Sequence, residues 1–158
     1  MREYMTGITV SQFDWNYYLP SFAPTELYSP ILLQHNLLHT LDIESACKLQ
    51  RFRDRIFDLT KQGIVVNGHG HTRRGVRAIE DQLAIIKQTE GAEILSMHCQ
   101  GKAFDCSLAN WGTYTPEWLA DQAKVFGFGG VGTYKSAGFV HVDTRLNHDG
   151  TQTLWTRA

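Results

Sequence analysis

The longest periodic segment of the chain, residues 42–60, has the spacing of an amphipathic helix and sets the frame for the fold. Its apolar side chains recur at three- and four-residue intervals, namely Leu49, Phe52, Ile56 and Leu59. Thr40 is expected to cap this helix and Gly63 to end it. The other apolar runs are shorter, so short strands and further helices must complete the fold.

Two more helices and several short strands are predicted. The helices cover residues 78–89 and residues 116–127, and Thr115 is expected to cap the second, with proline at its first position. β-Branched content and intervening turn residues predict strands at residues 64–66, 93–97, 103–108, 128–134 and 139–144. Residues 1–30 contain three prolines and are expected to be irregular, with one short strand near residues 8–10. This order predicts an α+β fold with mostly antiparallel strands.

Composition bounds the class of protein. The length of 158 residues fits one domain, residues 1–158, and no repeat or linker divides it. Fifteen basic and sixteen acidic side chains give a formal charge of -1, which provides no general attraction to nucleic acid. Three irregularly spaced cysteines argue against a disulfide framework. No segment is apolar enough for a membrane span or a secretory signal, so we expect synthesis in the cytosol and no membrane insertion.

Three polar side chains have the spacing of a metal site. His98 precedes a glycine turn and Asp105 follows it, so the turn can bring these side chains face to face. In the strand predicted at residues 139–144, His141 and Asp143 share one face and the valines occupy the other. Two imidazoles and one carboxylate suit zinc and leave a fourth position for water. Spacing alone leaves a second interpretation, because histidine and aspartate often lie on strands without binding metal.

Three motifs together resemble a known family. They are RGxR at residues 74–77, SxHxxGxAxD at residues 96–105 and GFVHVD at residues 138–143. In this order they resemble the zinc D-Ala-D-Ala carboxypeptidase and endopeptidase family, peptidase family M15, and above all its branch common in bacteriophages. The resemblance covers roughly residues 64–145, and Trp155 is in keeping with it. It implies the hedgehog/DD-peptidase fold, a small antiparallel sheet flanked by helices.

The resemblance also implies roles for individual residues. The implied zinc ligands are His98, Asp105 and His141. Arg77, with Arg74, would steady the substrate carboxylate or the oxyanion, and Ser96 would line the substrate site.

The proton carrier is where this chain departs from the family pattern. Many relatives place an acid three residues before the last zinc histidine, and this chain has Gly138 there. Some relatives carry a second histidine at the following position, which is Phe139 here. Asp143 shares a strand face with His141 and is therefore the candidate general base. The alternative role for Asp143 is to orient a histidine ligand from behind.

Other histidines and cysteines allow competing metal sites. His69 and His71 form an HxH pair on a loop, and His35 and His39 lie four residues apart without the glutamate of an HExxH motif. A packing or surface role is the simpler interpretation for all four. The two cysteines that flank the proposed ligands are expected to point away from the site as small buried side chains.

The functional expectation is a zinc peptidase that hydrolyses D-amino-acid-containing peptides of peptidoglycan, as a phage-type lysis or virion enzyme that reaches the wall after the membrane is breached. A cytosolic D,D-dipeptidase or carboxypeptidase is the enzymatic alternative. Both would take a wall stem peptide or a small D-amino-acid peptide as partner, and no nucleic acid. The alternative from another class is a non-catalytic zinc-binding or virion structural domain, because a fold alone does not establish catalysis.

Overall fold

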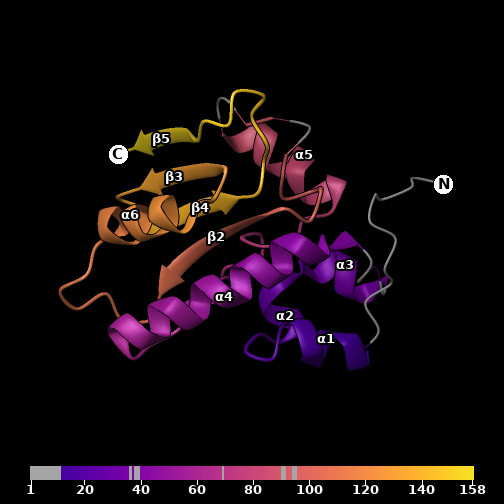
Figure 1. Ribbon diagram of the computed structural model, residues 1–158. Coiled ribbons are helices and arrows are strands. Elements are labelled where there is room, and N and C mark those ends of the chain that lie inside the picture. The colour runs from indigo at the N-terminus through magenta and orange to yellow at the C-terminus, as the bar shows by residue number, and fades with distance from the viewer. Residues whose placement is uncertain (1–11, 36, 38–39, 69, 90–91, 94–95) are drawn as a thin grey trace.

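The computed structural model of the protein describes residues 12–35, 37, 40–68, 70–89, 92–93 and 96–158 (Figure 1). The helices are α1 (Gln12–Tyr18), α2 (Pro24–Leu27), α3 (Pro30–Gln34), α4 (Ile43–Thr60), α5 (Ile79–Gln88) and α6 (Pro116–Phe126). The strands are β1 (Ile64–Val65), β2 (Ala103–Leu108), β3 (Gly130–Tyr134), β4 (Phe139–Asp143) and β5 (Thr153–Arg157). The predicted α+β class is confirmed. No helix in the described ranges is long and apolar enough to cross a membrane.

The helix predicted over residues 42–60 is α4, but its ends differ from the prediction. Asp42 caps it instead of Thr40, because the Asp42 carboxylate accepts the backbone N–H of Ser45 at 3.0 Å. Lys61 adopts a left-handed conformation with φ of 61°, so the helix ends at Thr60 with Lys61, rather than Gly63, as its C-cap. α5 and α6 each lie within one residue of their predicted bounds.

The N-terminal segment differs most from the prediction of irregular structure. Pro24 and Pro30 begin α2 and α3, because the N–H that proline lacks has no helical partner at the first position of a helix. α1 packs against α4 through the buried Trp15, whose Nε1–H donates to the carbonyl of Phe22 at 2.7 Å. The short strand predicted near residues 8–10 lies outside the described residues.

The five strands form one sheet in the order β1-β2-β4-β3-β5. All pairs are antiparallel except β3 and β5, which run parallel. β5 was not predicted, because this edge strand is polar and half-exposed and carries no apolar run. Of the strand predicted at residues 93–97, residues 94–95 lie outside the described ranges. Met97 belongs to a turn instead, closed where the Lys102 N–H donates to its carbonyl at 3.0 Å.

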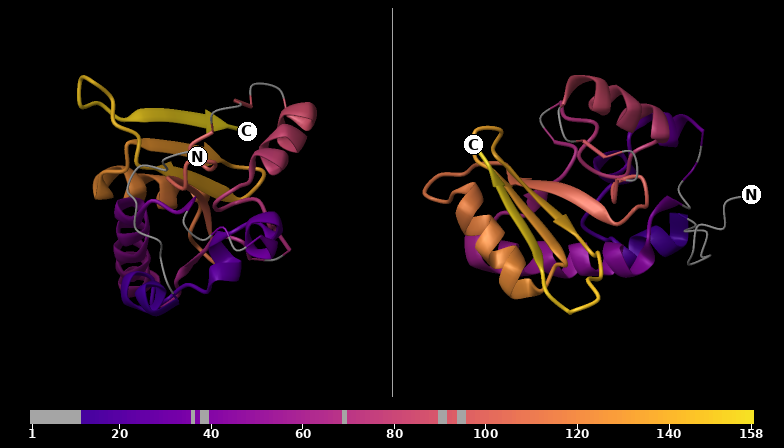
Figure 2. Two further views of the ribbon diagram at one scale, coloured as in Figure 1. Left: turned by 90° about the vertical axis from the view of Figure 1, so that its right-hand side faces the viewer. Right: turned by 90° about the horizontal axis from the view of Figure 1, so that it is seen from above.

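The two faces of the sheet have opposite character. Val140 and Val142 of β4 are fully buried on the face that α4 and α6 cover (Figures 1 and 2). The predicted alternation of β4 is therefore confirmed, since His141 and Asp143 occupy the other face. Directly across the sheet from His141 lie Asp105 on β2 and Gly132 on β3. Strand pairing thus assembles a polar row from segments far apart in the sequence.

Candidate metal centre

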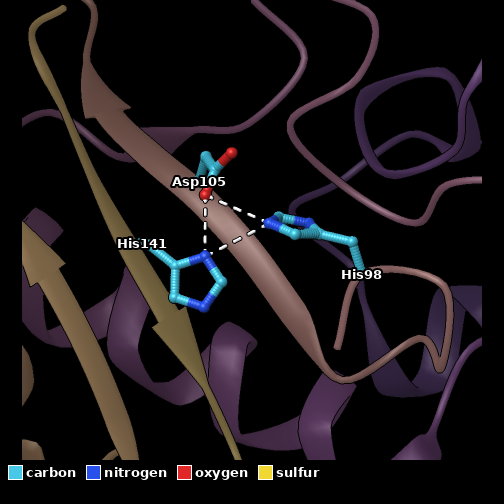
Figure 3. A group of neighbouring side chains, drawn as sticks. All are labelled: His98, Asp105 and His141. Carbon is cyan, nitrogen blue, oxygen red and sulfur yellow. Dashed lines mark hydrogen bonds and ion pairs between the residues drawn. The ribbon is translucent and has the colours of Figure 1, made fainter. Parts of the chain in front are cut away.

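Three buried side chains converge on one point above the polar face of the sheet (Figure 3). His98 Nε2 lies 3.2 Å from Asp105 Oδ1, and His141 Nδ1 lies 3.0 Å from the same oxygen. The two ring nitrogens are 3.2 Å apart. β2 and β4 supply Asp105 and His141 in direct register, and His98 comes from the turn that precedes β2.

The remaining ring nitrogens determine which atoms face this centre. His98 Nδ1 lies 2.8 Å from the carbonyl oxygen of Gly75, which can only accept a hydrogen bond. His141 Nε2 lies 2.8 Å from Asp143 Oδ2, which is also an acceptor. Each neutral imidazole therefore donates its one N–H outward and turns a lone pair inward. Two nitrogen lone pairs and a carboxylate oxygen then meet with no hydrogen between them, an arrangement that a cation stabilises.

The dimensions and chemistry of this cluster fit a metal ion. A tetrahedral ion with nitrogen and oxygen ligands at 2.0–2.1 Å holds neighbouring ligand atoms about 3.3 Å apart. The three observed separations, from 3.0 to 3.2 Å, are close to that value. His98, Asp105 and His141 could therefore hold a metal ion. A neutral-nitrogen and carboxylate set of this kind is typical of zinc among several divalent ions.

Electrostatics favour the metal-binding forms of Asp105 and His98, but not that of His141. Burial raises the pKa of Asp105, but the two imidazoles outweigh burial and hold that pKa well below its usual range. Burial lowers the pKa of His98, which favours the neutral ring. Burial also lowers the pKa of His141, but hydrogen bonds to Asp105 and Asp143 outweigh burial and leave that pKa raised. A metal ion would compete with a proton at His141.

The RGxR segment holds two of the three ligands through its backbone. The carbonyl of Arg74 accepts the Asp105 N–H at 2.6 Å, and the Arg77 N–H donates to the carbonyl of His98 at 3.1 Å. The His98 ring also donates its Nδ1–H to the carbonyl of Gly75, so the segment contacts the chain on both sides of the turn that precedes β2. Gly75 is required here, because an added Cβ would lie 2.1 Å from the carbonyl oxygen of Leu27.

The two arginines of this segment make contacts that their predicted substrate roles did not anticipate. Arg77 Nη2 pairs with Asp105 Oδ2 at 3.1 Å, and Arg77 Nη1 donates to Gln82 Oε1 at 3.1 Å. Its guanidinium lines the cavity but is engaged with the outer oxygen of a ligand. Arg74 lies over the ring of Phe139, 4.7 Å from its centroid, and is not among the cavity-lining residues.

Asp143 lies behind His141 and is fully buried. Besides its contact with His141 Nε2, it accepts from Arg145 Nε at 2.9 Å and from Arg145 Nη2 at 2.6 Å. Gly130 makes room for this carboxylate, since a Cβ there would lie 2.4 Å from it. The His141 and Arg145 contacts outweigh burial and hold the pKa of Asp143 well below its usual range. This environment matches the orienting role rather than exposure to a substrate.

The metal centre opens into a cavity of about 840 Å³. One wall is α5, through Gln82 and Ile85, and the opposite wall is the polar face of the sheet. Ser96 lines the cavity as the resemblance implies, and its hydroxyl accepts the His98 N–H at 3.2 Å. Gly138 ends the turn before β4 with φ of 68° and does not line the cavity.

Trp155, which is in keeping with the resemblance, lies beside the site together with Arg145 and Asn67, which sequence reasoning did not single out. Trp155 lies 5.1 Å from His141, centroid to centroid, against Gly132, where an added Cβ would come within 2.3 Å of its ring. Arg145 lies over the Trp155 ring at 5.4 Å. Asn67 holds the RGxR segment by accepting the Arg74 N–H at 2.9 Å. Arg145 had a detectable signal, because it continues the alternation of His141 and Asp143.

The competing metal sites gain no support. His39 and His69 lie outside the described residues, so the geometry of their proposed pairs is not described. Cys106 is buried on the opposite face of β2 from Asp105, and Cys99 directs its Sγ towards the carbonyl of Ala78 at 3.8 Å. Within the described residues, the His98, Asp105 and His141 group contains no thiol.

Comparisons of the chain with family models, curated proteins and solved structures find no match.

Proposed function

We propose that the protein is a zinc-dependent peptidase of the D-Ala-D-Ala carboxypeptidase and endopeptidase family, with the hedgehog/DD-peptidase fold. Its substrates would be D-amino-acid-containing peptides of bacterial peptidoglycan. The convergence of two imidazole lone pairs and one carboxylate oxygen at a cavity is the observation that carries this proposal. The ordered motifs at residues 74–77, 96–105 and 138–143 support the choice of family.

The ligands His98, Asp105 and His141 would hold the zinc ion. When bound, zinc supplies Lewis acidity that polarises a carbonyl and lowers the pKa of water. The surrounding residues orient the ligands: Arg77 pairs with the outer oxygen of Asp105, and Asp143 fixes the tautomer of His141.

Peptide hydrolysis also needs a proton carrier, and we assign this role to Glu93. Asp143 is enclosed by His141 and Arg145, so we infer that it orients His141. Apart from Asp105, Glu93 is the one carboxylate that lines the cavity among the described residues. It is exposed, and its backbone carbonyl is anchored by Gln82 Nε2 at 2.7 Å. Glu93 would take a proton from the attacking water and pass it to the leaving amine.

A dye-release assay on purified peptidoglycan tests the proposal. We expect lysis that chelator abolishes and zinc restores. His98→Ala should lose both zinc and lysis, whereas His148→Ala, at an exposed histidine outside the cavity, should keep both. Tight zinc binding without cleavage by the unmodified protein would refute the peptidase and favour a non-catalytic zinc domain. Cleavage of soluble D-Ala-D-Ala but not of the wall would favour the cytosolic dipeptidase.

The three motifs resemble above all the phage-type branch of the family, and this resemblance supports a role in phage lysis or in a virion. Mass analysis of digested wall fragments would identify the bond that is cut and test this setting against the dipeptidase alternative.

A further inference from the structure

Asn67 lies two residues after β1 and contacts the RGxR segment through its side-chain amide. Its Oδ1 accepts the N–H of Arg74 at 2.9 Å and the N–H of Gly75 at 3.2 Å. Both partners can only donate, so the amide oxygen faces them, and its two lone pairs serve one N–H each. The Asn67 Nδ2 donates to the carbonyl of Tyr28 at 3.1 Å. One amide therefore uses both of its ends to bridge two segments of the chain.

The planarity of the peptide bond links these hydrogen bonds to the metal ligands. The Gly75 N–H and the Arg74 carbonyl belong to one trans peptide unit and point in opposite directions. Because Asn67 holds the N–H of this unit, the carbonyl is directed to the backbone N–H of Asp105, which it accepts at 2.6 Å. The side chain of Asn67 thus fixes a carbonyl that it does not touch.

The next peptide unit repeats this arrangement with a different support. Its N–H, from Val76, donates to the carbonyl of Leu27 at 2.6 Å. Its carbonyl, from Gly75, accepts the Nδ1–H of His98 at 2.8 Å. Two consecutive peptide units therefore each direct a carbonyl to a metal ligand. The second unit is held by backbone alone, whereas the first depends on a side chain, Asn67, that a substitution can remove.

We propose that Asn67 is a positioning residue of the metal centre. It sets the peptide unit that holds Asp105 and, through the adjoining unit, the ring of His98. Asn67 is half-buried, does not line the cavity and carries no charge. Removing its acceptor oxygen therefore leaves the charges of the centre unchanged and releases one peptide unit to rotate. The Asp105 backbone then loses its support on the side of the RGxR segment.

The zinc affinity of the folded protein tests this role, and this part of the test rests on the proposed function. Asn67→Leu has nearly the shape of asparagine but no acceptor, and it should weaken zinc binding by about 10–100-fold, as for other groups that orient metal ligands. Asn67→Asp keeps the acceptor oxygen and should retain most of the affinity.

Gln50→Leu is the matched control. The Gln50 amide also holds the N-terminal segment, because its Oε1 accepts the Ser21 N–H at 3.2 Å, and it lies outside the cavity. Gln50→Leu should lower Tm and leave the zinc affinity of the folded protein unchanged. A residue that only stabilises the fold would behave in this way, so the comparison separates positioning from stability.

Amide hydrogen exchange in the metal-free protein gives a readout that needs no zinc. Asn67→Leu should speed exchange of the Asp105 N–H by about tenfold, the effect of losing roughly one hydrogen bond, while the amides of the β3–β4 ladder stay protected. Asn67→Asp should restore slow exchange at Asp105, and Gln50→Leu should not alter it. Asn67→Ala removes the same acceptor with a smaller side chain and replaces Asn67→Leu if that variant does not fold.

Either an unchanged zinc affinity or an unchanged Asp105 exchange in Asn67→Leu would overturn the role of Asn67. A loss in Asn67→Asp as large as in Asn67→Leu would overturn it too, and so would an equal loss of zinc affinity in Gln50→Leu. If the unmodified protein binds no zinc, the proposed function fails, and the exchange of the Asp105 N–H then decides the positioning role by itself.

Discussion

At the scale of single residues, the centre depends on what lies behind its ligands. His141 presents Nδ1 inward because its Nε2 faces the buried carboxylate of Asp143. Arg145 pairs with that carboxylate and so favours its ionised form. His141, Asp143 and Arg145 therefore act as a unit, in which Arg145 balances the charge of Asp143 and Asp143 orients the His141 ring.

Replacing Asp143 by asparagine should reduce stability in a pH-dependent way. The pKa of Asp143 in the folded protein lies below its ordinary value of 3.8, so its contribution is present above about pH 4 and is lost as the pH falls. We expect Asp143→Asn to lower the free energy of unfolding by about 2 kcal/mol at neutral pH. Urea unfolding of the metal-free proteins should show the difference shrinking at acid pH. Asp121→Asn, at an exposed pair with Lys124, should change stability little.

Replacing Glu93 by glutamine tests the proton carrier. Glu93→Gln should lower kcat by about 10²–10⁴-fold, since proton transfer typically contributes that much, while the zinc content stays unchanged. Glu93→Asp should recover part of the rate, and Glu80→Gln on the exposed side of α5 should not alter it. A Glu93→Gln enzyme with full activity would remove Glu93 from the mechanism.

At the scale of elements, the RGxR segment positions ligands more than it offers side chains to a substrate. Its backbone carbonyls accept hydrogen bonds from the His98 ring and the Asp105 N–H, and its own Val76 side chain is buried. Val76 also pairs with the chain at Tyr28, so the N-terminal helices and the metal centre share one support.

Gly75→Ala should loosen this support. The added Cβ would collide with the Leu27 carbonyl and move the Gly75 carbonyl away from His98 Nδ1. We expect weaker zinc binding, by about 10–100-fold as for other residues that orient metal ligands, together with a lower Tm. Gly70→Ala on the same loop is the control, because a Cβ there meets nothing within 4 Å and only its φ of 81° is strained. Equal zinc affinities in the two variants would contradict this role of the segment.

At the scale of the whole molecule, the two faces of the sheet have different roles: one forms the apolar core and the other carries the candidate metal centre. One face packs on α4 and α6 through fully buried apolar side chains such as Val140, Phe52 and Leu119. The opposite face of the sheet lies across the cavity from α5 and carries Asp105, His141 and their charged neighbours. A metal ion would join β2, β4 and the turn at residues 97–101, which are otherwise held by strand pairing and the RGxR segment.

Zinc should therefore stabilise the folded chain as a unit. Binding to the folded state alone contributes about 2.7 kcal/mol when free zinc is one hundred times its Kd, which corresponds to a rise in Tm of roughly 5–10 °C for a chain of this size. Thermal unfolding with and without zinc measures this rise. His98→Ala should abolish it, and magnesium should not reproduce it, because magnesium prefers an octahedral oxygen shell. An unchanged Tm at saturating zinc would contradict the metal centre.

Local sequence determined the elements whose signals are short in range. The apolar spacing of α4, the cap of α6 at Thr115 and the alternation in β4 each follow from side chains within a few positions of one another. The ligands His98, Asp105 and His141 could also be named, because two motifs place them in order along the chain. The tertiary structure then brought these three side chains together, as predicted.

Other features were decided only by tertiary contacts. β5 carries no apolar run and exists as a strand because β3 offers it a parallel partner. Asp143 is enclosed because Gly130 and Arg145 surround it, and the pairing of β3 with β4 that places Gly130 there cannot be recognised from the alternation of β4 alone. Arg74 and Arg77 belong to one motif, yet Arg77 pairs with a carboxylate on β2 whereas Arg74 lies over the ring of Phe139. Spacing along the chain determines which residues can share a face, whereas only packing determines which partners their charges meet.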